Sequence, residues 1–202
     1  MKNNIKIPLI IISSIVGVLL FIALLGVGYL YSARTQEISD HDRNLIISPV
    51  QLEPYFTDFK SVNSAIKVNK VKYIDGELEL RMDYDIDDDE QPYMSVVITK
   101  SRKKSDASST YFIAWTAQNA IYNAYDSKFE VVEDNEFFSV GTQSRFAFVN
   151  YDGQILGNRL VFMQDKTVYE FTLTGFYIDD ADIWRELFAG KLEQLQRFKW
   201  GV

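Results

Sequence analysis

The strongest pattern along the chain is an uninterrupted apolar run near the amino terminus. Residues 7–31 contain no charged side chain, and Ser13 and Ser14 are their strongly polar members. As a helix, these residues would extend about 37 Å, more than the roughly 30 Å of a bilayer's hydrocarbon core. The run therefore predicts an N-terminal transmembrane helix. The residues expected to contact the lipid are Ile7, Leu20, Gly26, Tyr29 and Tyr31.

A cleaved signal peptide is the alternative interpretation of such a run. Signal peptides carry an apolar region of about 7–15 residues followed by small residues at the cleavage site. Here the run is longer, and Tyr31 stands where cleavage after Ala33 requires a small residue. Lys2 and Lys6 place residues 1–6 in the cytoplasm under the positive-inside rule. We therefore expect a single-pass signal-anchor protein of the plasma (inner) membrane, with its C-terminal part in the periplasm or outside the cell.

Beyond residues 32–45, a polar stretch expected to form a juxtamembrane stalk, alternating apolar and polar positions predict strands. The clearest case is residues 77–86, where apolar and charged side chains alternate. The Asp75-Gly76 pair before it favours a hairpin. The other predicted strands are residues 65–74, 93–99, 129–133, 145–150, 159–164 and 167–174.

Two segments have the 3.6-residue periodicity of helices. One runs from Ser105 or Asp106 to about Tyr125, and a closing helix starts near Asp179 and Asp180. Residues 46–202 are thus expected to form one extracytoplasmic α+β domain. We expect a mostly antiparallel sheet of about six to seven strands with two helices, in the order β-β-β-α-β-β-β-β-α.

The order of these elements resembles that of PsbP-like extracytoplasmic α/β/α domains. The segments that carry the resemblance are PYMSVVI before the long helix, and RFAFVNYDG, RLVF and TVYEFTL ahead of the closing helix. The resemblance covers roughly residues 62–198. It implies an accessory or assembly factor for membrane complexes, and it supplies no catalytic residues.

The charge balance narrows the classes of partner. Residues 1–33 hold two of the 21 basic residues and none of the 28 acidic ones, so the remainder carries 19 minus 28, a net charge of −9. Such a surface repels phosphate backbones and anionic headgroups, so nucleic-acid binding is not expected. The absence of cysteine excludes disulfides and thiol nucleophiles. His41 lies in a charged stretch and is expected to be solvated.

The sequence contains no recognisable catalytic or cofactor motif. A nucleophile elbow, a P-loop and a dinucleotide fingerprint are all absent. We therefore predict neither an enzymatic activity nor a cofactor. Phe137-Phe138 and Phe176-Tyr177 stand at element ends, where a small apolar ligand is a further possibility.

An acidic stretch follows the second predicted strand. Asp83, Asp85 and Asp87 alternate along it, and carboxylate oxygens are the ligands that calcium prefers. It is not an EF-hand loop, because Asp88 and Met94 stand where glycine and glutamate are required. The stretch is thus either a calcium site or a solvated loop that discourages aggregation at a sheet edge.

The central helix carries two stripes of side chains. We expect an aliphatic stripe to rest on the sheet, formed by Ile113, Ala117, Ala120, Ile121 and Ala124. An aromatic set lies roughly opposite and is expected to point outward: Tyr111, Trp115, Tyr122 and Tyr125. Exposed tyrosine and tryptophan are typical of binding hot spots. Either a partner protein docks there, or Pro49–Phe59 or the closing helix covers this set.

These patterns predict a non-enzymatic, membrane-anchored protein. Its extracytoplasmic domain is expected to bind or stabilise a membrane-associated protein complex as an accessory or assembly subunit. The alternative is an extracytoplasmic domain that binds a solute or calcium.

Overall fold

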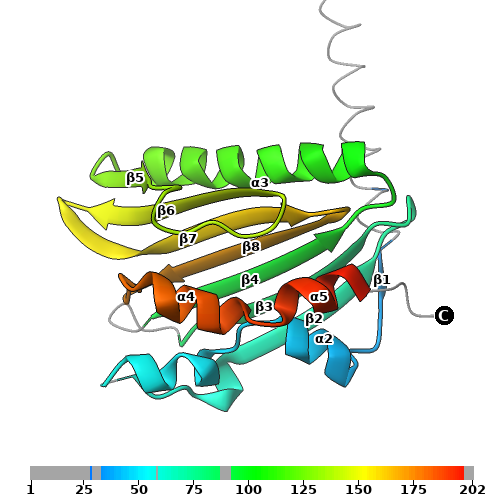
Figure 1. Ribbon diagram of the computed structural model, residues 1–202, viewed down its shortest axis with the longest axis horizontal. Helices are drawn as coiled ribbons and strands as arrows, with labels where there is room; N and C mark the ends of the chain where they lie inside the picture. Colours follow the sequence, from blue (N-terminus) through cyan, green and yellow to red (C-terminus); the bar gives the residue numbers. More distant parts are fainter. Residues whose placement is uncertain (1–27, 29–32, 58, 87–91, 198–202) are drawn as a thin grey trace, which may run out of the picture.

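The computed structural model describes residue 28 and residues 33–57, 59–86 and 92–197. Within these ranges, eight strands form one antiparallel sheet, surrounded by four α-helices and three short 3₁₀ helices (Figure 1). The strands are β1 (Arg34–Thr35), β2 (Ile66–Lys72), β3 (Leu78–Tyr84), β4 (Tyr93–Lys100), β5 (Phe129–Glu133), β6 (Gln143–Tyr151), β7 (Gln154–Gln164) and β8 (Thr167–Thr174). The helices are α2 (Asp40–Leu45), η1 (Pro49–Gln51), η2 (Glu53–Tyr55), η3 (Asn63–Ala65), α3 (Lys104–Tyr125), α4 (Ala181–Phe188) and α5 (Lys191–Arg197).

The sheet consists of two meanders in which consecutive strands are hydrogen-bonded neighbours. β1–β4 form the first meander and β5–β8 the second, and α3 carries the chain from one to the other. The meanders meet where β4 pairs with β8, with Tyr93 opposite Thr174 and Val97 opposite Glu170. The sheet is therefore continuous, although its two halves are separate in the sequence.

Turn residues set the hairpins within each meander. Gly76, with φ 87°, lies in the turn between β2 and β3, where Asp75-Gly76 predicts a hairpin. Between β6 and β7, Asp152 (φ 51°) and Gly153 (φ 80°) both take the left-handed conformation. Two consecutive positive φ angles match the right-handed twist of the flanking strands, which favours the tight connection seen here.

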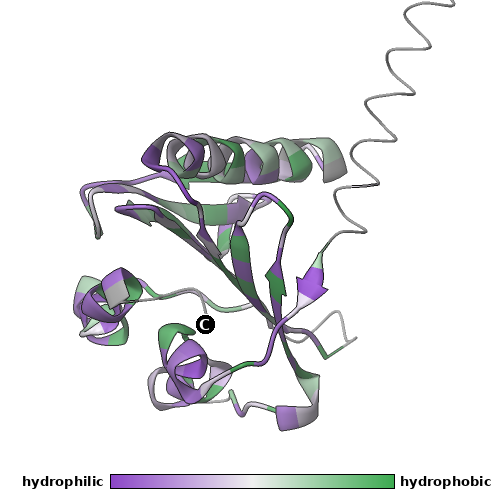
Figure 2. Ribbon diagram, turned by 90° about the vertical axis from the view of Figure 1, so that its right-hand side faces the viewer, coloured by the Kyte–Doolittle hydropathy of each residue, from purple (hydrophilic) through white to green (hydrophobic). Residues whose placement is uncertain are grey.

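One side of the sheet, called the first face below, carries the larger apolar core. Alternate residues of each strand point into it, as in β3, where Leu78, Leu80 and Met82 are buried. Helices α2, α4 and α5 lie on this side of the sheet (Figures 1 and 2). The ring of the fully buried Trp184 contacts four other rings, those of Phe138, Phe146, Phe171 and Phe188.

The predicted closing helix is interrupted. Ala189 leaves the helical conformation (φ −56°, ψ 123°) and Gly190 has φ 74°, so α4 and α5 are separate helices. A glycine adopts the left-handed conformation at little cost, which makes it a frequent residue at the end of a helix. The break lets α5 follow the curved sheet.

The polar stretch predicted to be a stalk is part of the domain instead. β1 pairs with β2, and α2 begins with a capping box in which Ser39 and Asp42 satisfy each other's backbone N–H groups. Lys70 Nζ lies 2.8 Å from the buried carboxylate of Asp42. Burial raises the pKa of Asp42, but hydrogen bonds from Lys70 and Ser39 outweigh it and hold this pKa below its ordinary value. β1 therefore extends the edge of the sheet, and α2 packs onto the first face.

The predicted fold class is wrong in its strand and helix counts. We expected six to seven strands and two helices behind a membrane span, whereas the described residues form a single eight-stranded, wholly antiparallel sheet with α2–α5. The extra strand and helix come mainly from residues 34–45, whose pairing with β2 the polar sequence did not reveal.

The prediction of a transmembrane, single-pass, signal-anchor protein is also corrected. In the described part of the chain, no helix is long and apolar enough to cross a membrane. α3, with 22 residues the longest of α2–α5, is interspersed with serine, threonine, glutamine and asparagine. The run on which the prediction depended, residues 7–31 with Ile7, Leu20, Gly26, Tyr29 and Tyr31, lies outside the described residues apart from Gly28.

Candidate functional site

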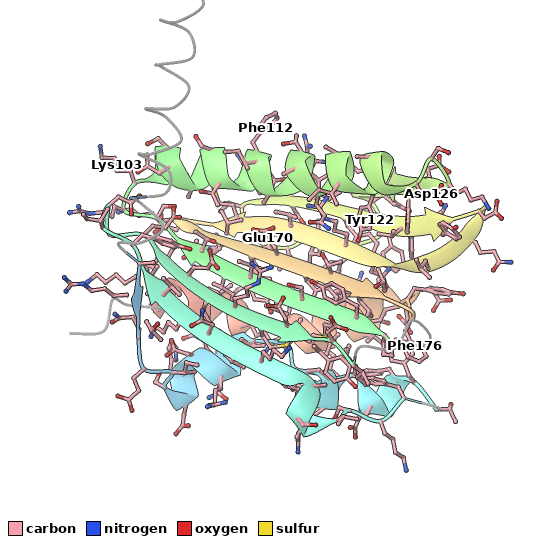
Figure 3. All side chains as sticks on the ribbon, turned by 180° about the vertical axis from the view of Figure 1, so that it is seen from behind. Lys103, Phe112, Tyr122, Asp126, Glu170 and Phe176 are labelled. Atoms are coloured by element: carbon pink, nitrogen blue, oxygen red, sulfur yellow. The ribbon has the colours of Figure 1, made fainter. Side chains whose placement is uncertain are left out.

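The second face of the sheet is covered in one half and open in the other. α3 lies over β5, β7 and β8 and forms a layer of its own on this side (Figure 2). Over β2, β3 and β4 no described helix lies in front of the sheet when it is seen from behind (Figure 3). The strand residues that alternate onto this open half are Lys67, Asn69, Val71, Glu79, Arg81, Asp83, Tyr93, Ser95, Val97 and Thr99.

Helix α3 has the opposite orientation from the predicted one. Trp115 is 4% exposed and, with Ala107, packs into the core between α3 and the sheet. Tyr111 and Tyr122 are half-buried, and burial raises the pKa of both phenols. The side chain of Tyr125 is outside the described residues. The aromatic set predicted to bind a partner thus faces the sheet in its described members, and neither Pro49–Phe59 nor the closing helix covers it.

The sheet beneath α3 explains this orientation. A tryptophan buries far more apolar surface than an alanine, so the Trp115 side is the more favourable one to remove from water. Two arginines also approach the Trp115 ring, with Cζ of Arg159 at 4.9 Å and Cζ of Arg145 at 5.6 Å from its centroid. A guanidinium over an indole ring is a favourable cation–π contact. Helix periodicity identified the two stripes correctly. It did not show which stripe would contact Arg145 and Arg159 of the sheet.

Arg159 is the centre of a buried polar cluster between β7 and α3. It is 1% exposed and donates hydrogen bonds to the backbone carbonyls of Ala114 and Trp115 and to Oδ1 of Asn119. Burial lowers the pKa of its guanidinium to about 10, although the nearby carboxylate of Glu170 opposes that change. Arg159 therefore fixes the position of α3 on the sheet through three acceptors of the helix.

Glu170 of β8 lies where the covered half of the second face meets the open half (Figure 3). Its cross-strand neighbours are Val97 and Val161, both apolar. Burial raises the pKa of its carboxyl to about 7, and the attraction of Arg159 lowers this pKa only in part. Glu170 thus changes its charge near neutral pH beside an accessible sheet surface.

The outer face of α3 is apolar and carries no charge. Phe112 and Ile113 are each 60% exposed and Ile121 is 56% exposed. Ala117, Ala120 and Ala124, expected to contact the sheet, are also exposed. No residue from 107 to 125 is charged. We call this surface, with Ser109 and Thr116, the outer face of α3 below.

The structure describes two of the three predicted calcium ligands, Asp83 and Asp85. Asp83 accepts hydrogen bonds from Nε of Arg81 (2.9 Å) and Oγ of Ser95 (2.8 Å). Asp85 is exposed, and Asp87 lies outside the described residues. In the ranges that the structure describes, no group of three or more histidine, aspartate or glutamate side chains is placed to hold a metal ion. Asp83 instead forms an ion pair with Arg81 on the open half of the second face.

Three of the four aromatic side chains at element ends, those of Phe137, Phe138 and Phe176, pack on the first-face core, whereas Tyr177 is 39% exposed. Phe138 is buried against Trp184 and Phe188, and Phe137 packs on Phe146 and Phe148. The ring of Phe176 contacts the rings of Phe56 and Phe59. Their rings therefore occupy the space that a small apolar ligand would need.

The residues that sequence reasoning missed are Arg159 and Glu170. Each is the single charged residue in a strand segment of otherwise uncharged and mainly apolar residues, NRLVFM and TVYEFTL. A lone charge within such a run is a signal, because burial of an isolated charge is costly unless it has partners. His41, expected to be solvated, is exposed.

Comparisons of this chain with protein-family models, with curated proteins and with solved structures find no match. The resemblance to PsbP-like domains stays a prediction.

Proposed function

We propose that this is a non-enzymatic accessory domain that binds another protein through the outer face of α3. The observation that carries the proposal is the exposure of Ile113 at the centre of the outer face of α3, with the exposed Phe112 and Ile121 at its two opposite edges. Contiguous apolar patches on a protein surface frequently mark interaction sites. Binding of another protein is also the function expected from the sequence. The proposed contact surface, however, includes the aliphatic stripe of α3, whereas the sequence predicted the aromatic one.

The charge distribution supports the same surface. Residues 34–202 have a net charge of −9, yet the stretch from residue 107 to 125 has no charge. Depletion of charged residues is typical of the buried centre of protein interfaces. Because α3 forms the outermost layer on its side of the sheet (Figure 2), a partner reaches this surface without displacing another described element.

The partner's chemistry follows from the surface. A 22-residue helix is about 33 Å long and offers ridges and grooves that another helix can fill. The alanines permit a close approach of the two backbones, and the larger side chains of Phe112, Ile113 and Ile121 supply the apolar contact area. We therefore expect the partner to contribute an uncharged, apolar helix.

Co-purification tests the proposal. The full chain, kept in solution with a mild detergent, is isolated from its native source as the wild type, as Ile113→Glu and as Ile74→Glu. Ile74 is 76% exposed in the turn between β2 and β3, so its substitution is a matched control. We expect a stoichiometric partner with the wild type and with Ile74→Glu, and its loss with Ile113→Glu. Retention of the partner by Ile113→Glu contradicts the proposal.

Solute binding on the open half of the second face is the second candidate. The observation that favours it is the half-buried carboxyl of Glu170 at the border of this open half, whose pKa burial raises to about 7. Thermal melting with and without small organic amines and calcium, at pH 6 and pH 8, tests this candidate. A rise in melting temperature that Glu170→Gln abolishes supports binding at this position. An unchanged melting temperature with every solute counts against it.

A further inference from the structure

We propose that one end of the sheet docks on the surface of an anionic lipid bilayer, through a basic patch beside an exposed apolar turn. The apolar group of the turn is Ile74. The basic side chains are all exposed and are those of Arg34, Lys72, Arg102, Lys103, Lys104 and Lys166. We call this surface the basic end below. It is separate from the outer face of α3, so the inference goes beyond the proposed function.

The sheet register brings these residues together although they are distant in sequence. One row across the sheet runs from Arg34 of β1 through Lys72, Leu78 and Lys100 to Thr167 of β8. The turns between β2 and β3 and between β7 and β8, and the start of α3, follow directly beyond this row. Figure 1 shows β1, the turn between β2 and β3 and the start of α3 on the same side of the molecule.

Contacts between the connecting segments hold the basic end together. The N–H of Ser101 donates a hydrogen bond to the carbonyl of Lys166 at 2.9 Å. Nη1 of Arg102 donates a hydrogen bond to the carbonyl of Asp75 at 3.4 Å. The basic residues before α3 therefore stand beside the turn that carries Ile74 and beside the turn between β7 and β8.

Basic charges outnumber acidic ones at this end. Residues 34–35, 72–77, 100–106 and 165–167 contain seven basic and four acidic side chains, a net charge of +3 in a chain of −7. The acidic residues are Asp75, Glu77, Asp106 and Asp165. Glu77 is half-buried and accepts a hydrogen bond from Oγ of Ser101 at 3.1 Å. The next acidic residues, Glu37 and Glu79, lie inward of the row that Arg34 begins. The local charge thus has the opposite sign from that of the whole chain, and it attracts anionic headgroups.

The basic residues at the start of α3 are placed against the preference of a helix. Lys103 is the N-cap and makes no side-chain hydrogen bond to the helix, and Lys104 is the first helical residue. The start of a helix carries a partial positive charge, which favours acidic side chains and disfavours basic ones. Asp106 in the first turn offsets this effect in part. The arrangement lowers the stability of α3 and adds to the positive potential that an anionic surface meets.

The exposed turn supplies an apolar contact within the basic patch. Ile74 is 76% exposed, more than any other large apolar side chain in the described part of the chain. Its turn is closed by a hydrogen bond from the N–H of Gly76 to the carbonyl of Tyr73 at 3.0 Å. At a bilayer surface an apolar side chain enters the boundary of the acyl chains, while neighbouring lysine and arginine stay with the phosphates. Each such cation strengthens binding to anionic lipid about fivefold.

The path of the chain agrees with this orientation. β1 begins at Arg34, so the chain enters the domain at the basic end. The preceding residues 7–31 contain no charged side chain, and apolar side chains favour lipid over water. With the bilayer at the basic end, α3 runs from Lys103 near the lipid to Asp126 away from it (Figure 3). The outer face of α3 then stays accessible to a protein partner.

A fluorescent probe on the turn tests this inference in the full chain. The sequence has no cysteine, so Ile74→Cys carries a single thiol and takes a polarity-sensitive dye at that position alone. The labelled chain is mixed with vesicles of neutral phosphatidylcholine, or with vesicles that also contain anionic phosphatidylglycerol. With the anionic vesicles at low salt, we expect a blue shift of the emission and quenching by brominated lipid. High salt should remove both, because it screens the attraction.

A charge-removal variant shows whether the basic patch causes the shift. It combines Arg102→Gln, Lys103→Gln and Lys104→Gln, and the dye on Ile74→Cys should lose most of its shift. The matched control removes the same number of charges from exposed lysines nearer the other end of the sheet, and it should keep the shift: Lys60→Gln, Lys67→Gln and Lys128→Gln. Far-UV circular dichroism and the melting temperature show that both variants fold.

A second dye position tests the orientation. Ile155 is 41% exposed at the start of β7, at the opposite end of the sheet. The dye on Ile155→Cys should show no shift with either kind of vesicle. A shift as large as that at Ile74→Cys overturns the end-on orientation.

The remaining outcomes decide the inference independently of the proposed function. An unshifted dye at Ile74→Cys with anionic vesicles overturns docking on lipid, as expected if the patch binds an acidic protein instead. An equal shift with neutral vesicles, or in the charge-removal variant, overturns recognition by charge. Co-purification with Ile113→Glu is done in detergent, without a bilayer, so its result does not depend on the basic end. Ile74→Glu remains a suitable control there for the same reason.

Discussion

The two faces of the sheet differ in how completely they are covered. On the first face, Trp184 and Phe188 belong to a network of touching rings that extends through Phe146 and Phe162. On the second face, α3 covers one half with a smaller core around Trp115, and the other half has no described helix over it. The first face therefore stabilises the fold, whereas the second keeps apolar and charged groups accessible.

The difference also appears in the polar groups. The buried Lys70 and Asp42 at the first face form a direct ion pair. Arg159 at the second face instead bonds to carbonyls of α3, and Glu170 lies in an apolar setting that raises its pKa to about 7. Burial of a carboxyl without a direct ion-pair partner is costly, so Glu170 lowers the stability of the fold on the second face. The first face has a comparable cost at Lys191, which is buried and donates hydrogen bonds to the backbone carbonyls of Asn44 and Ile46.

The largest effect on the free energy of unfolding is expected for Trp184→Ala. Removal of a fully buried indole leaves a cavity among four rings, which should lower the free energy of unfolding by about 3–5 kcal/mol. Urea denaturation followed by far-UV circular dichroism measures this change. Tyr177→Ala, at an aromatic position that is 39% exposed, is the control and should change stability much less. A loss below about 1 kcal/mol for Trp184→Ala would contradict the dominance of the first face.

Trp115→Ala should destabilise the protein by a smaller amount, about 2–3 kcal/mol. Its ring is buried in the smaller core and also loses the contacts with Arg145 and Arg159. The same urea experiment applies. If Trp115→Ala changed stability no more than a surface substitution does, the orientation of α3 described above would be wrong.

Glu170→Gln should change the pH dependence of stability. The folded carboxyl ionises near pH 7, whereas the unfolded one ionises near its ordinary value of 4.5. The raised pKa favours the folded state at low pH, and this contribution is lost as pH rises from 4.5 to about 7. Glutamine does not ionise, so the variant should gain on the order of 2 kcal/mol relative to the wild type between pH 4.5 and 8.

Urea denaturation at pH 4.5, 6 and 8 measures this difference, and Glu136→Gln at an exposed position is the control. The free-energy difference between Glu170→Gln and the wild type should grow with pH, while that for Glu136→Gln stays flat. Parallel pH profiles for the two variants would show that Glu170 ionises at an ordinary pKa.

The smallest effect on stability is expected for Phe112→Ala. The ring is 60% exposed, so its truncation should change the free energy of unfolding by less than about 0.5 kcal/mol. In the co-purification experiment, however, the same variant should weaken retention of the partner. A clear loss of folding stability would instead indicate that Phe112 belongs to the core.

For strands with strict alternation, the sequence predicted both the position and the buried face. For a helix with two stripes, it predicted the position but not which face is buried. Leu78, Leu80 and Met82 lie where the pattern of β3 places them, because the side-chain period of two leaves one choice of buried face. For α3 the pattern offered two faces, and the choice depended on Arg159, which is distant in sequence. A contact between residues distant in sequence is not visible in the local pattern of apolar and polar residues.

Other features had local signals that the pattern of apolar residues does not include. The Ser39 and Asp42 capping box that starts α2 follows the S-x-x-D spacing of a helix start. Gly190 marks the break between α4 and α5. The partial exposure of Glu170 had no such signal, because it depends on which strands α3 covers.

The arrangement of the sheet as two meanders sets an order of assembly. Six of the seven strand pairings in the described residues join strands that are consecutive in the chain. Five of them close connections of at most nine residues, whereas residues 36–65 separate β1 from β2. The pairing of β4 with β8 requires closure of a loop of about 70 residues, and distant pairings form more slowly than local ones. Each meander therefore forms early, and docking of the two along β4 and β8 is the slow step of folding.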